Sequence, residues 1–267
     1  MKISHEAPKS IFKLVSEVTD YSYALVHLFE EDDEYLQAFK DEKWLGREII
    51  LDNSVFELET EFDSDRFYYW VEELQPTWFI IPDKLEDAER TIQNVLNWNE
   101  NYSITTCSRS IGVVQGKTYE EVVECYKAIQ YHVDKIAISF DYSFFKTLEV
   151  TQNKFLFPTV YHQYMVGRQN LIERLLKDGV IDQSKPHHLL GCGLPQEFIA
   201  YRNYKWIDSV DTSNPVVHGI NLIEYNEDGL QDKIKTKLID YIDYELTDEQ
   251  IDSIMHNIKL FRGFCNG

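Results

Sequence analysis

Two short stretches, Trp78-Phe79-Ile80-Ile81 and Ile136-Ala137-Ile138, decide the fold class. Both are continuously apolar, which is typical of strands covered on both faces of a parallel sheet. Similar runs recur along the chain with helical segments between them, and this alternation predicts an α/β fold. The predicted strands are Tyr23–Phe29, Glu48–Asn53, Thr77–Pro82, Ser110–Gln115, Lys135–Phe140, His187–Cys192 and Lys205–Val210, with Val216–Ile223 as a candidate eighth.

The segments between these strands have helical periodicity. Capping boxes mark two helix starts, Thr118-x-x-Glu121 and Thr247-x-x-Gln250. The predicted helices are Ser64–Leu74, Lys84–Trp98, Thr118–Tyr131, Val166–Gly179, Pro195–Asn203, Gly229–Tyr244 and Thr247–Phe261. This pattern and the length of 267 residues predict a (β/α)8 TIM barrel that spans residues 1–267 as one domain. A doubly wound open sheet is the rival, but no Gly-x-Gly-x-x-Gly or Walker motif supports it.

Composition narrows the class of protein further. Four cysteines without close spacing indicate free thiols in a reducing cytoplasm and no metal site, and no motif calls for a cofactor. The sequence has no apolar run long enough to cross a bilayer and no signal-peptide pattern, so we expect no membrane association. A net charge of −20 opposes binding to nucleic acid unless basic residues gather locally.

Acidic and amide side chains follow the predicted strands. They are Asp52, Asp83, Gln115 with Gly116, Asp141, and Asp208 or Asp211. In a barrel the carboxyl ends of the strands form the face that carries active sites. Any one aspartate after a strand is commonly a helix cap or turn former, but the recurrence over consecutive strands favours a carboxylate-rich active site. Paired carboxylates suit glycoside-type chemistry.

These same residues resemble the motifs of tRNA-guanine transglycosylases, barrel enzymes that exchange guanine for a 7-deazaguanine. The family's Asp-Ser-Gly-Gly-(Phe/Tyr)-Gln is similar to Asp52–Glu57, and its Gly-Ile-Val-Gln-Gly-Gly to Gly112–Lys117. Its Asp-Glu-Cys segment is represented by Pro82-Asp83, its Met-Gly-Val-Gly-x-Pro-Glu-Asp by Leu190–Glu197, and its Phe-Asp-Cys-Val by Ile207–Val210, with Gly219 at the family distance.

The departures from the family point to one of its branches. The family's Cys-x-Cys-x-x-Cys zinc motif is absent, and the Arg after the nucleophile motif is replaced by Asn214-Pro215. A short chain without the zinc subdomain resembles the 7-deazaguanine DNA transglycosylases of phages and bacterial DNA-modification clusters. The resemblance therefore implies a DNA substrate in preference to tRNA, and a base such as 7-cyano-7-deazaguanine as the small-molecule substrate.

The resemblance also implies roles for individual residues. Asp208 would be the nucleophile that forms a covalent glycosyl intermediate, and Asp52 the general acid/base. Asp211, on the opposite face of the same strand, is the alternative nucleophile. The base-binding residues would be Asp83, Gln115, Gly116, Phe56, Asp141, Gly191 and Gly193. Core packing is the alternative for Phe56, and a tight turn is the alternative for the two glycines.

A nucleic-acid substrate requires local positive charge. The segment from Lys154 to Lys205 contains seven Lys and Arg residues but only four Asp and Glu residues, with tyrosines among them. In a nucleic-acid complex the tyrosines could stack on bases while the cations neutralise the phosphates. The candidate contacts are Arg168, Arg174, Arg202 and Lys205; an ordinary solvated face is the alternative.

Three other functions compete with the DNA enzyme: an enzyme acting on RNA, one acting on free bases or nucleosides, and a non-catalytic barrel subunit that binds nucleic acid or a partner enzyme. The sequence does not indicate the oligomeric state.

Overall fold

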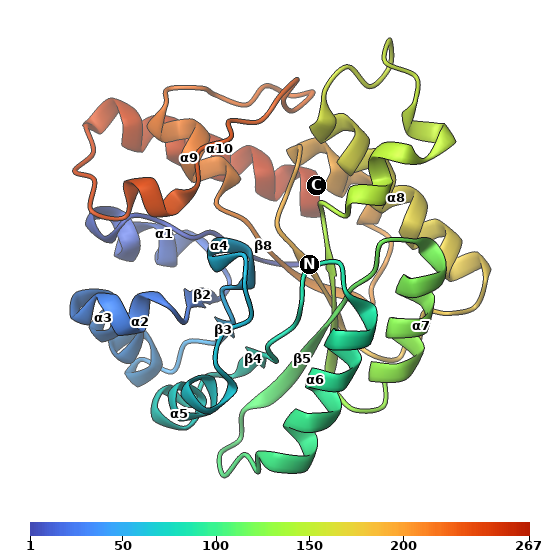
Figure 1. The fold of residues 1–267 in the computed structure, drawn as a ribbon. Helices are drawn as coiled ribbons and strands as arrows, with labels where there is room; N and C mark the ends of the chain where they lie inside the picture. The colour runs from blue at the N-terminus through green and yellow to red at the C-terminus, as the bar shows by residue number, and fades with distance from the viewer. The chain divides into compact units, whose positions relative to one another are not determined.

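The computed structural model describes all 267 residues and contains one parallel eight-stranded sheet (Figure 1). Its strand order is β1-β8-β7-β6-β5-β4-β3-β2, and helices follow most strands, so the fold class is the predicted (β/α)8 barrel. The strands are β1 Lys2–Ser4, β2 Ser22–Leu25, β3 Ile49–Asp52, β4 Trp78–Ile80, β5 Arg109–Val114, β6 Lys135–Ser139, β7 His187–Leu190 and β8 Ile207–Asp211.

The chain divides into two compact units. The second unit, residues 21–138 and 175–188, contains β2 to β5 and most of β6. Its helices are α2 Leu28–Glu31, α3 Asp33–Trp44, α4 Val55–Leu58, α5 Ser64–Leu74, α6 Ala88–Asn101 and α7 Tyr119–Ile129. Aromatic side chains form much of its core: the Trp98 ring lies 5.7 Å from Phe67 and 5.5 Å from Phe79, between centroids. Edge and tilted ring contacts of this kind add to the free energy of burial.

The first unit, residues 1–20, 139–174 and 189–267, contains β1 paired with β8. Its helices are α1 Phe12–Val18, most of α8 Val160–Lys177, α9 Asn214–Ile220 and α10 Asp248–Asn266, with 3-10 helices at Lys9–Ile11, Ser143–Thr147, Glu149–Thr151, Pro195–Tyr201 and Leu238–Tyr241. Helices α9 and α10 lie side by side (Figure 1). Gly219 makes this possible, because a Cβ there would lie 2.6 Å from the Cα of Ile254.

The structure corrects three sequence predictions. Val216–Ile223 is not a strand: helix α9 begins at Asn214, and Pro215 in its first turn suits a helix start but not a central strand. The sheet instead gains its eighth strand from β1, a three-residue strand too short to be recognised. Gly229–Tyr244 is mostly irregular and helical only over Leu238–Tyr241, and its first residue, Gly229, bridges to Asn226 in a turn. Pro195–Asn203 is a 3-10 helix that ends at Tyr201.

Candidate functional site

In the second unit, three polar side chains meet beyond the carboxyl ends of β3, β4 and β5. Asp83 follows β4 and is only 1% exposed. Its Oδ1 accepts a hydrogen bond from Asn53 Nδ2 at 2.7 Å, and its Oδ2 accepts one from Gln115 Nε2 at 2.7 Å. The sequence placed Asp83 and Gln115 in one site, and the structure brings them together. Asn53 was missed, although it directly follows Asp52.

Burial dominates the electrostatics of Asp83. Loss of solvation raises the pKa of the Asp83 carboxyl to about 6, against the lowering effect of the hydrogen bonds from Asn53 and Gln115. Both donors are neutral amides, so neither brings a positive charge that would offset the cost of burying the carboxylate. A carboxylate has about four lone-pair positions, so two amide donors leave acceptor capacity for a ligand.

Both polar atoms of the Gln115 side-chain amide form hydrogen bonds within the protein. Its Nε2 donates to Asp83, and its Oε1 accepts from the backbone N–H of Glu86 at 2.9 Å. Gln115 therefore orients Asp83. Gly116 serves close packing, because a Cβ there would lie 2.8 Å from the backbone N of Val122 in α7.

Asp52, the last residue of β3, lies in a separate hydrogen-bonded turn of the same unit. Its Oδ1 accepts from the Tyr23 hydroxyl at 3.0 Å, and its Oδ2 accepts from the Ser54 backbone N–H at 2.8 Å. Ser54 takes a left-handed conformation with φ 60°, which turns the chain sharply into α4. Phe56, in α4, is 42% exposed, so the core-packing alternative for this ring is wrong.

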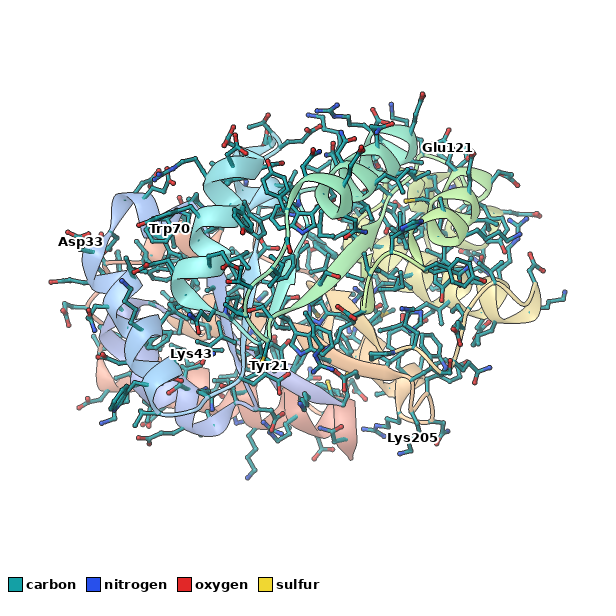
Figure 2. All side chains as sticks on the ribbon, turned by 90° about the horizontal axis from the view of Figure 1, so that it is seen from below. Tyr21, Asp33, Lys43, Trp70, Glu121 and Lys205 are labelled. Carbon is teal, nitrogen blue, oxygen red and sulfur yellow. The ribbon has the colours of Figure 1, made fainter.

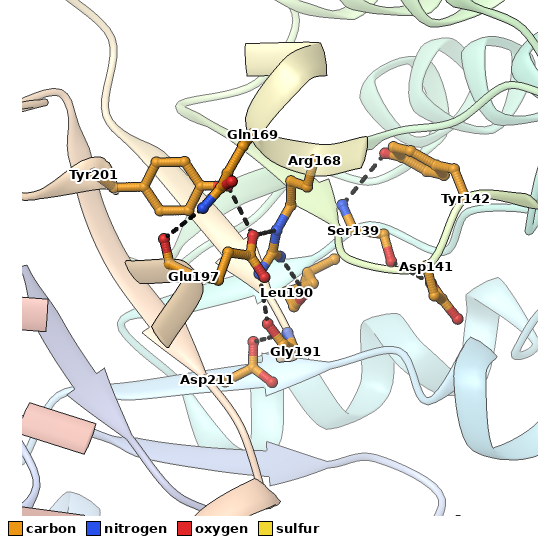
Figure 3. Close-up of polar contacts among 10 residues, drawn as sticks. All are labelled: Ser139, Asp141, Tyr142, Arg168, Gln169, Leu190, Gly191, Glu197, Tyr201 and Asp211. Carbon is orange, nitrogen blue, oxygen red and sulfur yellow. Dashed lines mark hydrogen bonds and ion pairs between the residues drawn. The ribbon is translucent and has the colours of Figure 1, made fainter. Parts of the chain in front are cut away.

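In the first unit, Figure 3 shows a buried ion pair behind the end of β7. Arg168 of α8 and Glu197 are both fully buried, with Nε and Oε1 2.6 Å apart. Arg168 also donates to the carbonyl oxygens of Leu190 at 2.9 Å and Gly191 at 3.1 Å, and the Tyr201 hydroxyl donates to Glu197 at 2.7 Å. The prediction of Arg168 as a nucleic-acid contact is therefore wrong, because its guanidinium is enclosed by protein.

This ion pair holds the glycine turn after β7 in place. Gly191 has φ +63°, and a Cβ there would lie 2.6 Å from the Phe140 ring. Its backbone N–H donates to Asp211 Oδ1 at 3.4 Å (Figure 3). Gly193 follows, and its carbonyl accepts from Asn214 Nδ2 at 3.1 Å. Gly191 thus has the backbone conformation of a tight turn.

The two candidate nucleophiles lie at opposite ends of β8. Asp211 is the last residue of the strand and is 6% exposed, beside the Gly191 turn. Asp208 is the second residue of the strand, at its amino-terminal end, and lines a cavity there. Active sites of (β/α)8 barrels form at the carboxyl ends of strands. The expectation that Asp208 occupies that face is therefore corrected, and the alternative, Asp211, takes its place.

Asp141 lies just after β6 and accepts a hydrogen bond from Ser139 Oγ at 2.8 Å (Figure 3). Burial raises the pKa of Asp141, and the hydrogen bond from Ser139 and the charge of Lys233 oppose the rise. Lys233 was missed by sequence reasoning. Its Nζ lies 4.6 Å from the Phe140 ring centroid and donates to the Cys192 carbonyl at 2.9 Å. It sits in an irregular segment that was predicted to be a helix, so no periodicity placed it there.

The remaining basic candidates lie on the surface. Arg174 is exposed on α8, Lys205 is exposed before β8, and Arg202 is half-buried. No group of three or more His, Cys, Asp and Glu side chains is arranged to hold a metal ion. No helix combines the length and apolarity needed to cross a membrane.

No protein-family model matches the chain, and no curated protein matches it.

Proposed function

We propose that this protein is a base-exchange transglycosylase that replaces guanine in nucleic acid with a 7-deazaguanine base. The observation that carries the proposal is the buried Asp83 carboxylate, which neutral amides of Asn53 and Gln115 hold beyond the strand ends. An ionised carboxylate can accept both the N1–H and the exocyclic amine of a guanine-type base. Its raised pKa makes this recognition dependent on pH above about 6.

The proposed reaction has two displacements. A carboxylate oxygen of Asp211 attacks C1′ of the target nucleoside, the C1′–N bond breaks, and guanine leaves with a proton from Asp52. Asp52 then takes a proton from the incoming base, whose nitrogen attacks C1′ and releases Asp211. Two inversions retain the configuration at C1′, as in retaining glycosidases. In this proposal the Phe56 ring, which is 42% exposed, stacks on a base.

DNA is the preferred polymer in this proposal, because the chain resembles the zinc-free branch of the family. A duplex hides C1′ and its base, so we expect a flipped nucleotide or a single strand as the substrate. The four cysteines are free, which suits a cytoplasmic enzyme.

The decisive experiment incubates the protein with guanine-labelled DNA or tRNA and 7-cyano-7-deazaguanine. We expect guanine release from DNA and a covalent protein–DNA adduct. Guanine release from tRNA but not from DNA would show that the substrate is RNA. Release from neither polymer would contradict the proposal and favour a free-base enzyme or a non-catalytic binding subunit.

A matched pair of variants on β8 tests the nucleophile. Asp211→Asn should abolish the adduct, whereas Asp208→Asn, at the other end of the strand, should retain it. Asp52→Asn should slow base exchange by about 10²–10⁴-fold, the range for loss of a general acid/base. An adduct lost in Asp208→Asn and kept in Asp211→Asn would reverse the assignment.

A further inference from the structure

A second candidate site lies in the first unit at the amino-terminal end of β8. A cavity of about 390 Å³ opens there between β1, β8, the segment before β8, and the end of α10. Asp208 lines this cavity, so it is separated along β8 from Asp211 and the glycine turn after β7. The volume falls in the range of small-molecule sites.

The charge of this cavity is opposite to that of the whole chain. Four cationic side chains line it, against the carboxylates of Asp20 and Asp208: Lys2, Arg202, Lys205 and Arg262. In a chain with a net charge of −20, such a local excess of cations creates an isolated positive potential. An excess of cations of this kind favours a ligand with negative charge.

Backbone and side-chain contacts hold the two guanidinium groups in place. Arg262 donates from Nη1 to Asp20 Oδ2 at 3.1 Å and from Nη2 to the Val18 carbonyl at 2.9 Å. Arg202 donates to the carbonyl oxygens of Phe264 at 2.9 Å and Gly263 at 2.6 Å. These two partners of Arg202 are neutral carbonyl oxygens. A fixed cation loses little conformational entropy when an anion binds.

Lys205 adds a mobile cation to this fixed frame. It is exposed and lies at the outer edge of the molecule, as Figure 2 shows. A flexible ammonium suits a phosphate group as a point charge, whereas Arg supplies directed donors.

An aromatic wall completes the cavity. Tyr204 lines it, and its ring stacks on Trp206 with centroids 5.6 Å apart and planes at 23°. The stack fixes the Tyr204 ring, which is half-buried. Aromatic rings beside a basic groove are the combination that binds nucleotides, since the base stacks while the cations hold the phosphate.

We propose that this cavity binds the phosphate and base of a nucleotide, either free or within a single strand of nucleic acid. The inference does not depend on the transglycosylase reaction, because it uses none of the residues that act in the proposed displacements, which are Asp52, Asp83 and Asp211. Arg202 and Lys205 would both bind the phosphate of this nucleotide. Arg168 and Arg174 do not line the cavity and have no part in this binding.

Isothermal titration calorimetry with the full chain tests the proposal. The probes are AMP, inorganic pyrophosphate, adenosine and the oligonucleotide (dT)8, at low and moderate salt. We expect one saturable site for AMP or (dT)8, weakened by salt, and no binding of adenosine. Tighter binding of (dT)8 than of AMP would identify a strand as the source of the nucleotide, and the reverse order a free nucleotide.

Variants link the binding to the cavity. Lys205→Glu should weaken binding by at least about tenfold, which corresponds to about 1.4 kcal/mol. Lys127→Glu makes the same charge change at an exposed residue of α7 and should change the binding affinity by less than twofold. Tyr204→Ala should weaken AMP more than pyrophosphate. Equal affinity in Lys205→Glu and the unchanged protein, with equal melting temperatures, would overturn the proposal, as would the absence of saturable binding by every probe.

Discussion

Two buried carboxylates behind strand ends are stabilised in different ways. Glu197, in the first unit, is paired with the Arg168 guanidinium at 2.6 Å and accepts from the Tyr201 hydroxyl at 2.7 Å. Asp83, in the second unit, accepts hydrogen bonds from the side-chain amides of Asn53 and Gln115, each at 2.7 Å. Both side chains are almost inaccessible to solvent.

The difference is between a carboxylate paired with a cation and one held by neutral hydrogen-bond donors. Glu197 is held in a buried ion pair, and its partner Arg168 also donates to the carbonyl oxygens of Leu190 and Gly191. Amide donors satisfy Asp83 without neutralising it, so burial brings its pKa to about 6. A group that changes charge near neutral pH is suited to ligand recognition, whereas a locked ion pair is suited to positioning.

The largest effect is expected when the ion pair is broken. Arg168→Met removes the cation and leaves Glu197 buried without its charged partner. We expect the free energy of unfolding to fall by about 3–5 kcal/mol, the usual cost of an uncompensated buried charge. Urea unfolding at neutral pH, followed by circular dichroism, measures the change.

A double variant shows whether charge or packing is responsible. Arg168→Met with Glu197→Gln removes both charges and should recover a substantial part of the lost stability. A double variant as unstable as Arg168→Met alone would mean that the hydrogen bonds to Leu190 and Gly191, and not the charge of Glu197, dominate.

A smaller effect, dependent on pH, is expected at Asp83. The pKa of its carboxyl rises from 3.8 in the unfolded chain to about 6 in the folded protein, so the folded state binds more protons between these values. Its contribution to stability is therefore complete below about pH 4 and is lost as the pH rises through 6. The loss corresponds to about 3 kcal/mol, at 1.36 kcal/mol per pKa unit.

The comparison with Asp83→Asn isolates this contribution. Burial lowers the pKa of His5 and of His187 to about 4, so both histidines destabilise the protein as the pH falls below 6.5, opposite in sign to Asp83. We subtract the unfolding free energy of Asp83→Asn from that of the unchanged protein. This difference should decrease as the pH rises from 4 to 7.5. A difference independent of pH would contradict the raised pKa of Asp83.

The sequence predicted the barrel because apolar runs at a regular spacing need no tertiary information. It located Asp52, Asp83 and Gln115 for the same reason, since each follows such a run directly. It failed for Asp208 and Asp211 because it placed the strand at Lys205–Val210, whereas β8 begins at Ile207 and ends at Asp211.

Arg168 and Lys233 illustrate a second limit. Nothing local distinguishes a buried arginine from a solvated one on the same helix, and Arg174 is an exposed example on α8. The distinction comes from Glu197, 29 residues away, which packs against the Arg168 side chain. Sequence periodicity therefore cannot predict long-range ion pairs or the positions of side chains in irregular segments.

The smallest effect compares two glycines with the same backbone conformation. Gly191, in the turn that Arg168 supports, has φ +63°, and Gly179, after α8, has φ +65°. Alanine at either position costs about 1 kcal/mol for the left-handed backbone. Only Gly191→Ala adds a steric conflict, because its Cβ would lie 2.6 Å from the Phe140 ring, while nothing lies within 4 Å at Gly179. Gly191→Ala should therefore lower the melting temperature more than Gly179→Ala. Equal losses would mean that Phe140 moves aside and that the turn is less tightly held than the Arg168 network implies.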